Sequence, residues 1–342
     1  MKRNSRRRRA YRGYQGRRRR TSPIPILLLA LAVLAGAGFL IYRHFHTAGA
    51  EPAAQPPVSD APDAAQPASP KPLAEHETTP SGIPCTRTDL GAEALYTGDL
   101  ILVNNQIFYH FPDEPEKSLS VIFDNKTSSY FVRDREVLLA PHALTALNEM
   151  MDAFQAQGGS KSVNVVAGFR TKDFQQHLFE QSAEQNGLEH ARQFVAQPGG
   201  SEHHTGLVVD FSILNADGSS AEYQGVGEYA WINENCQNYG WVVRYDMNKV
   251  AMTGISTEPW HFRYVGVPHA TVMVQENLCL EEYIDYLRQF PFDGEHLTAA
   301  CAGGTEWEIW YCEGSEAYVP DSGTYTVSGN NVDGIIVTYQ VQ

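Results

Sequence analysis

The chain has 342 residues with 26 Lys or Arg against 40 Asp or Glu, which gives a formal net charge of −14 at pH 7. Eleven of the basic residues lie within residues 1–20, and no acidic residue occurs before Glu51, so the rest of the chain is far more acidic than the total indicates. A surface this acidic repels anions, which excludes nucleic acid as a partner held by charge.

The N-terminal part predicts a membrane anchor. Residues 1–23 are a basic tail, and residues 24–42 are uncharged and nearly all apolar, which is close to the minimum length for a transmembrane helix. Basic residues before this helix and an acidic part after it predict a single-pass protein of the cell membrane, with a cytoplasmic N-terminus and an extracytoplasmic globular part. A cleaved signal peptide is the alternative, because residues 48–50 (AGA) resemble a cleavage site.

Composition then divides the rest of the chain. Residues 43–84 are rich in Pro and Ala and carry few large apolar residues, so they predict a disordered linker. The globular part is expected at residues 85–292, followed by a small β-rich C-terminal appendage at residues 293–342. The five cysteines leave at least one thiol unpaired; Cys301 and Cys312 flank an expected hairpin and are the favoured disulfide, with buried free thiols as the alternative.

Hydrophobic periodicity gives the expected elements in chain order. Helices are predicted over residues 140–157, 171–185, 227–238, 269–277 and 281–290. Strands are predicted within 99–109 and over 163–167, 207–213, 241–245, 260–265, 307–311, 324–328 and 335–340. In the second helix, Phe174, Leu178 and Phe179 form the expected buried stripe. We therefore predict an α+β fold, in which a small antiparallel sheet has flanking helices.

The first stretch with metal-binding side chains is residues 201–210 (SEHHTGLVVD). His203 and His204 precede an expected strand on which Asp210 shares one face with Val208, so Asp210 lies within an apolar run. A buried carboxylate without a partner is costly, and a metal ion is one partner it could have. A structural aspartate bonded to backbone amides is the alternative.

The second stretch is residues 258–261 (EPWH). A catalytic zinc site needs three protein ligands and one open position for water. His261 can be the third ligand, while Glu258 can take a proton from that water and pass it to a leaving amine. Taken alone, this motif is weak, because a single histidine followed by aromatic residues is more often part of a core.

Together the two stretches resemble the zinc D-alanyl-D-alanine carboxypeptidases of the VanY type, in the LAS or hedgehog-like metallopeptidase superfamily. That family carries the patterns S-x-H-x-x-G-x-x-x-D and E-x-W-H-x-R-Y, and the resemblance covers roughly residues 90–290. It implies a single zinc ion held by His203, Asp210 and His261, with Glu258 as the general base, and it leaves His204 aside.

A third stretch, residues 168–171 (GFRT), resembles the family's G-[YF]-R-[ST] pattern, which is followed by a glutamine five residues after the arginine. The resemblance implies that Arg170, Gln175 and Ser201 bind the substrate. An arginine suits this task because its guanidinium can pair with a terminal carboxylate or stabilise a developing oxyanion, so Arg170 is also expected to act in catalysis. A surface arginine at a helix start is the alternative.

The expected function is removal of the C-terminal D-Ala from peptidoglycan stem peptides. One alternative is an L,D-carboxypeptidase acting on tetrapeptide stems. Another is an inactive cell-wall-binding module that uses the C-terminal appendage as its contact.

Overall fold

The computed structural model describes residues 77–341. The predicted cytoplasmic tail, transmembrane helix and most of the linker lie outside these residues and stay predictions. Within the described part, none of the helices combines the length and the apolar character that crossing a bilayer requires.

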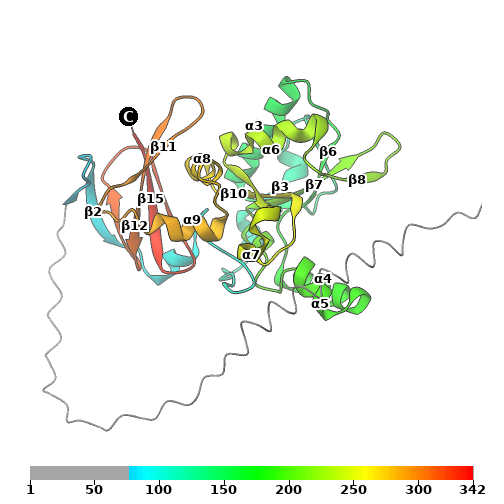
Figure 1. Cartoon of the computed structure of the whole chain (residues 1–342), viewed down its shortest axis with the longest axis horizontal. Coiled ribbons are helices and arrows are strands. Elements are labelled where there is room, and N and C mark those ends of the chain that lie inside the picture. The colour runs from blue at the N-terminus through cyan, green and yellow to red at the C-terminus, as the bar shows by residue number, and fades with distance from the viewer. Residues whose placement is uncertain (1–76, 342) are drawn as a thin grey trace, which may run out of the picture. The chain divides into compact units, whose positions relative to one another are not determined.

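The main sheet has six strands in the order β4-β6-β7-β10-β9, and β8 pairs with β7 (Figure 1). Its strands are β4 (Phe131–Val132), β6 (Val163–Ala167), β7 (Val208–Leu214), β8 (Ser220–Glu222), β9 (Trp241–Tyr245) and β10 (Glu258–Tyr264). The α+β class is confirmed, and the expected antiparallel sheet is present except at one edge, where β4 runs parallel to β6. The helix between these two strands carries the chain back to the same end of the sheet, as a parallel pair requires.

Within residues 77–341, eight α-helices accompany the sheets. They are α2 (Ile122–Asn125), α3 (Pro141–Ala156), α4 (Lys172–Asn186), α5 (Leu188–Phe194), α6 (Ala230–Asn235), α7 (Val250–Thr253), α8 (Val267–Gln275) and α9 (Leu280–Leu287). Four predicted helices are confirmed as α3, α4, α8 and α9. The helix predicted over residues 227–238 is divided into α6 and two flanking 3-10 turns.

Helix α3 and the main sheet enclose the first core. The α3 side chains Leu147, Met150 and Phe154 pack with Val209 of β7 and Phe262 of β10. All of these side chains are at most 1 % exposed. This core fixes β7 and β10 side by side, and these two strands carry Asp210 and His261, two of the three candidate metal ligands.

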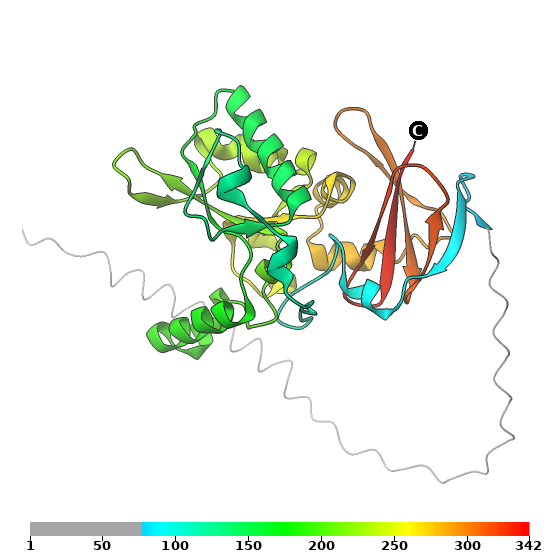
Figure 2. The same cartoon turned by 180° about the vertical axis from the view of Figure 1, so that it is seen from behind.

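Two local predictions are wrong. In α4 the stripe of Phe174, Leu178 and Phe179 is not buried; Phe174 is 49 % exposed and Gln175 is the buried member. The reason is that α4 packs mainly against α5, and both helices stand away from the main sheet in Figures 1 and 2. Residues 99–109 form no strand, although Leu100 to Val103 are buried.

The C-terminal sheet has the strand order β11-β12-β15-β14. Its strands are β11 (Leu297–Ala300), β12 (Glu306–Glu313), β14 (Tyr325–Gly329) and β15 (Gly334–Val341). A second small sheet joins β1 (Glu77–Thr78) and β2 (Pro84–Asp89) to β13 (Glu316–Pro320). The first described residues therefore lie beside the C-terminal strands, as both views show (Figures 1 and 2). The domain limits at residues 85, 292 and 293 stay a prediction.

Cys301 and Cys312 lie in two different hydrophobic cores of the C-terminal region. Cys301 packs with side chains of α8 and α9, whereas Cys312 packs with Phe292 and Trp310 in a separate core. All five cysteines are buried free thiols. The predicted Cys301–Cys312 disulfide is therefore wrong, because the two side chains lie in different cores.

Candidate metal centre and active site

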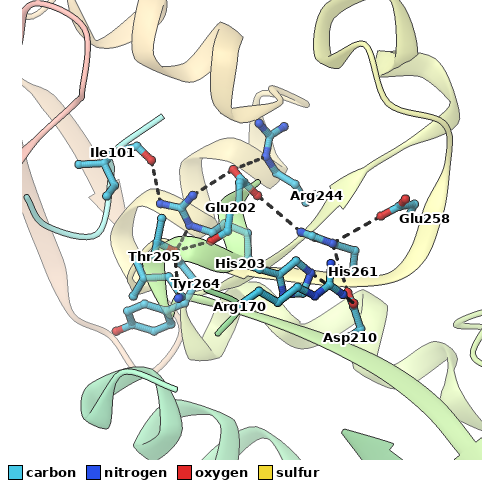
Figure 3. Close-up of polar contacts among 12 residues, drawn as sticks. Ile101, Arg170, Glu202, His203, Thr205, Asp210, Arg244, Glu258, His261 and Tyr264 are labelled. Atoms are coloured by element: carbon cyan, nitrogen blue, oxygen red, sulfur yellow. Dashed lines mark hydrogen bonds and ion pairs between the residues drawn. The ribbon is translucent and has the colours of Figure 1, made fainter. Parts of the chain in front are cut away.

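Two neighbouring strands and a short turn bring together three side chains that could hold a metal ion. Asp210 of β7 is paired in register with His261 of β10. His203 lies in the 3-10 turn Glu202–Thr205 that precedes β7, and this turn ends at Gly206 with a φ of 70°. One donor atom from each of the three side chains lies within 4.8 Å of the others (Figure 3).

The contacts within this cluster orient the donor atoms. His203 Nε2 lies 3.2 Å from Asp210 Oδ2, and His261 Nδ1 lies 3.2 Å from Asp210 Oδ1. The other ring nitrogen of His203, Nδ1, lies 2.6 Å from the carbonyl oxygen of Gly168, to which it can donate a hydrogen bond. His203 therefore presents Nε2, and His261 presents Nδ1, toward the same carboxylate.

These residues fit a zinc ion. Asp210 Oδ1 is buried and has no hydrogen-bond partner among the described residues. Such an orphaned carboxylate oxygen beside two imidazole nitrogens is a site that a divalent cation would satisfy. Two histidines and one carboxylate are a donor set found in catalytic zinc sites, which leave a further position open.

His204 is placed differently from His203. Its Nδ1 lies 2.7 Å from the carbonyl oxygen of Arg170, and its Nε2 accepts a hydrogen bond of 3.1 Å from the backbone N–H of Gly199. Both ring nitrogens are thus occupied by the backbone, while the ring packs near Tyr109 and Phe111. This arrangement supports a structural role for His204.

Glu258 is the first residue of β10 and lies beside the cluster. Its Oε2 is 3.4 Å from His261 Nδ1. Burial raises the pKa of the Glu258 carboxyl to about 7, and the nearby carboxylate of Asp210 acts in the same direction, against the opposing effect of His261. A carboxyl with a pKa near the working pH suits proton transfer in both directions.

The two histidines have pKa values shifted in opposite directions. Burial, with the nearby Arg170, lowers the pKa of His203 to about 4 despite the attraction of Asp210. For His261, burial alone would lower the pKa, but Asp210, Glu202 and Glu258 outweigh it and raise the value to about 9. Of the two histidines, His261 is therefore the one whose imidazole lies among several carboxylates.

The three residues predicted to bind substrate line one pocket of about 280 Å³ together with the cluster. Arg170 follows β6 and precedes α4, and its Nη2 donates a hydrogen bond of 2.8 Å to Asp210 Oδ2. Gln175 is buried, and its Nε2 donates a hydrogen bond of 2.8 Å to the carbonyl oxygen of Ala196. Ser201 is buried in the wall of the same pocket.

Sequence reasoning missed the residues behind the metal cluster. Glu202, Arg244 and Arg263 form a buried network of ion pairs. Burial would raise the pKa of Glu202, but the two arginines outweigh it and hold this pKa well below its ordinary value. The signal in the sequence is weak, since Glu202 fills a variable position of the first motif and Arg263 is the arginine of the second motif, to which the resemblance gives no role.

Comparison with known proteins agrees with this geometry. The VanY family, described as D-alanyl-D-alanine carboxypeptidase, matches residues 136–267. A D-alanyl-D-alanine carboxypeptidase of Enterococcus faecium is 32% identical over 252 residues, which is 72% of this chain and 76% of that protein. The bifunctional D-Ala-D-Ala dipeptidase and D-Ala-D-Ala carboxypeptidase VanXYC of Enterococcus gallinarum is 38% identical over 159 residues, or 46% of this chain and 82% of that protein.

A solved structure is similar over most of the described residues. The vancomycin resistance D,D-dipeptidase VanXYg, in complex with a D-Ala-D-Ala phosphinate analog, has a TM-score of 0.66 and 29% sequence identity. The match covers 75% of this chain and 99% of that one. Sequence, fold and the geometry of the site thus agree, and the chain belongs to the VanY family of D-alanyl-D-alanine carboxypeptidases.

Proposed function

We propose that this protein is a zinc-dependent D-alanyl-D-alanine carboxypeptidase that removes the C-terminal D-Ala from peptidoglycan stem peptides. The observation that carries the proposal is one pocket that joins the cluster of His203, Asp210 and His261 to Glu258 and Arg170. The pocket thus combines a donor set for zinc, a carboxyl able to move a proton and a cation able to meet a carboxylate.

His203, Asp210 and His261 would hold the zinc ion, which when bound supplies a Lewis acid and makes a water molecule more acidic. Glu258 accepts the proton of the attacking water and gives it to the amine nitrogen of the departing D-Ala. The pKa of about 7 lets Glu258 take the proton in one half of the reaction and release it in the other.

Arg170 provides the positive charge that the substrate needs. The pocket carries several carboxylates, so a peptide with a terminal carboxylate would be repelled without a cation in the wall. Arg170 bonds Asp210 through Nη2, and its side chain is 20% exposed toward the pocket. Its guanidinium is thus able to pair with the substrate carboxylate or with the developing oxyanion.

Gln175 and Ser201 complete the substrate wall. Gln175 Oε1 is buried and has no hydrogen-bond partner among residues 77–341, so it is available to accept a hydrogen bond from the peptide. Ser201 adds a hydroxyl in the same pocket. These side chains would orient the peptide so that its last bond faces Glu258.

The test uses the purified chain with zinc added, and it measures zinc content and D-Ala release from a pentapeptide and a tetrapeptide stem. We expect about one zinc ion per chain, D-Ala release from the pentapeptide and little release from the tetrapeptide. Release from the tetrapeptide alone would instead identify an L,D-carboxypeptidase. A protein that binds peptidoglycan but releases D-Ala from neither peptide would be a wall-binding module, and the proposal would fail.

We also propose that the catalytic part works outside the cytoplasm, held to the cell membrane by residues 24–42. The support is the uncharged apolar run between a basic tail and an acidic globular part. The chain in intact cells should fractionate with the membrane and be degraded by external protease after the wall is removed. Recovery in the soluble cytoplasmic fraction would contradict this location.

A further inference from the structure

Glu202 is a buried carboxylate that the reaction described above does not use. It is 1 % exposed and lies between the substrate-wall residue Ser201 and the metal-binding His203. Its Oε1 accepts hydrogen bonds from Arg244 Nε at 2.9 Å and from Arg263 Nη1 at 3.0 Å. One oxygen of the carboxylate is therefore fixed by two guanidinium groups.

The other oxygen faces the metal cluster. Glu202 Oε2 lies 3.6 Å from His261 Nε2 (Figure 3). Both atoms are buried, and neither has a hydrogen-bond partner among the described residues. Because an unpaired buried polar atom is costly, a small closing movement that joins the two would satisfy both.

The contact between Glu202 Oε2 and His261 Nε2 determines the state of the other ring nitrogen, Nδ1. Nδ1 lies 3.2 Å from Asp210 Oδ1 and 3.4 Å from Glu258 Oε2, so this side of the ring faces the metal-binding cluster. A neutral imidazole carries one N–H and one lone pair. If Nε2 holds the hydrogen and donates it to Glu202, Nδ1 is left with the lone pair that a metal ion needs.

We infer that Glu202 is a positioning residue for His261: it accepts a hydrogen bond from Nε2, fixes the ring tautomer and presents Nδ1 to the metal ion. His203 is held in a similar way, but by its other nitrogen: its Nδ1 bonds the carbonyl oxygen of Gly168, and its Nε2 faces the cluster. A carboxylate partner also makes the ligating nitrogen more basic than a carbonyl does. This inference rests on the zinc site of the proposed function.

The charges around Glu202 are balanced for this role. Arg244 also donates to both carboxylate oxygens of Glu281, at 2.9 and 2.7 Å. Arg263 donates its remaining hydrogen bonds to the backbone carbonyls of Tyr264, Asp99 and Ile101. Two guanidinium groups thus face two carboxylates, and Glu202 stays ionised in the interior with one oxygen free for His261.

Glu202→Gln is the decisive variant because the two arginines select the orientation of the new amide. Both arginines are donors, so they require the amide oxygen, and the amide NH₂ then faces His261 Nε2. A donor at that place favours the tautomer with the hydrogen on Nδ1, which blocks the metal-binding lone pair. We expect zinc affinity, measured by competition with a chelator, to fall about 10- to 100-fold.

Glu281→Gln is the matched control. It removes a carboxylate from the same Arg244 but has no contact with His261 among the described residues. We expect this variant to have a lower unfolding temperature and a zinc affinity within about twofold of the wild type. The reason is that zinc affinity depends on residues that hydrogen-bond to a metal ligand, and in the described part of the chain Glu281 does not bond to one. Equal losses of zinc affinity in the two variants would overturn the inference, and so would wild-type affinity in folded Glu202→Gln.

A measurement on the wild-type protein covers the case in which Glu202→Gln fails to fold. Nitrogen-15 NMR of the zinc-loaded protein distinguishes the two ring nitrogens of His261. We expect a protonated Nε2 and a metal-bound Nδ1; a metal-bound Nε2 would overturn the inference. If the wild-type chain binds no zinc at all, the proposed function fails as well, so the two failures are distinguishable.

Discussion

Arg170 and Asp210 are joined by a hydrogen bond of 2.8 Å between Nη2 and Oδ2, so the cation assigned to the substrate is bonded to a metal-binding carboxylate. The same oxygen of Asp210 lies 3.2 Å from His203 Nε2. The guanidinium is thereby held at the edge of the metal cluster, where the scissile carbonyl would be expected. The guanidinium also partly neutralises Asp210. This neutralisation weakens the attraction of the Asp210 carboxylate for a metal cation.

This relationship predicts that Arg170 contributes to turnover and not to metal binding. Arg170→Ala should lower kcat/KM for a D-Ala-D-Ala pentapeptide by about 10²- to 10³-fold, because a donor to the oxyanion is lost. Zinc affinity should be unchanged or increased, since Asp210 loses a competing cation. Lys172→Ala removes the same charge two residues away, and full activity is expected there; a large loss of zinc from Arg170→Ala would contradict the prediction.

A second prediction separates proton transfer from metal binding. Glu258→Gln should keep its zinc and lose turnover by about 10²- to 10⁴-fold, because the amide cannot accept the proton of the attacking water. Metal analysis and D-Ala release on the same preparation check both parts. Glu222→Gln, which changes an exposed glutamate of β8, should remain active. Full activity of Glu258→Gln would mean that another group is the base.

A third prediction concerns the two adjacent histidines. His203→Ala should lose zinc, whereas His204→Ala should keep it and lower the free energy of unfolding by about 1–3 kcal/mol, because a buried backbone donor is left unpaired. Chelator competition and urea denaturation measure the two effects. Loss of zinc from His204→Ala alone would show that the ligand is the second histidine.

The gathering of His203, Asp210 and His261 into one cluster could be predicted because its signal in the sequence is local. Alternation along residues 207–213 puts Val209 and Asp210 on opposite faces of the strand, and β7 has Val209 in the core with Asp210 at the cluster. The choice of His203 over His204 needed the family pattern. In the structure, the difference between them depends on the carbonyls of Gly168 and Arg170, which precede the two histidines by 35 and 34 residues, and on the N–H of Gly199.

The carboxylate behind His261 could not be predicted for a physical reason. Sequence reasoning sees a glutamate beside two histidines, and a glutamate is normally exposed. Glu202 is buried only because Arg244 of β9 and Arg263 of β10 meet it from two strands of the folded sheet. The exposed Phe174 is a similar case, because burial of α4 depends on where the helix packs and not on its own apolar residues.

The pairing of residues near the start of the described part with the C-terminal strands predicts that the C-terminal appendage is needed for folding. Leu102 N donates to the carbonyl of Asn330, and Asn331 Nδ2 donates to the carbonyl of Leu102. Tyr283 of α9 and Ile336 of β15 also share one core. Removal of residues 293–342 should therefore abolish cooperative unfolding, measured by circular dichroism; a cooperative transition would contradict this prediction.

A last prediction concerns the pH dependence of stability and rests on His269 of α8. His269 Nδ1 lies 2.8 Å from the hydroxyl of Tyr283, and Nε2 lies 3.0 Å from that of Thr338. Burial lowers the pKa of His269 from 6.5 to about 4, against a weaker attraction from Asp99. The folded state thus binds fewer protons than the unfolded state between these values, so stability is lost as pH falls from about 6.5 to about 4.

His269→Gln removes this titration, and comparing the variant with the wild type at each pH cancels the other titrating groups. The stability advantage of the wild type in urea denaturation should shrink as pH falls from about 6.5 toward 4. His142→Gln is the opposite case, because the hydrogen bond to Asp99 raises the pKa of the His142 imidazole. Its stabilising contribution is present below the unfolded pKa and is lost as pH rises, so the advantage of the wild type over His142→Gln should grow as pH falls. Parallel pH profiles for the two differences would contradict at least one of the two assignments.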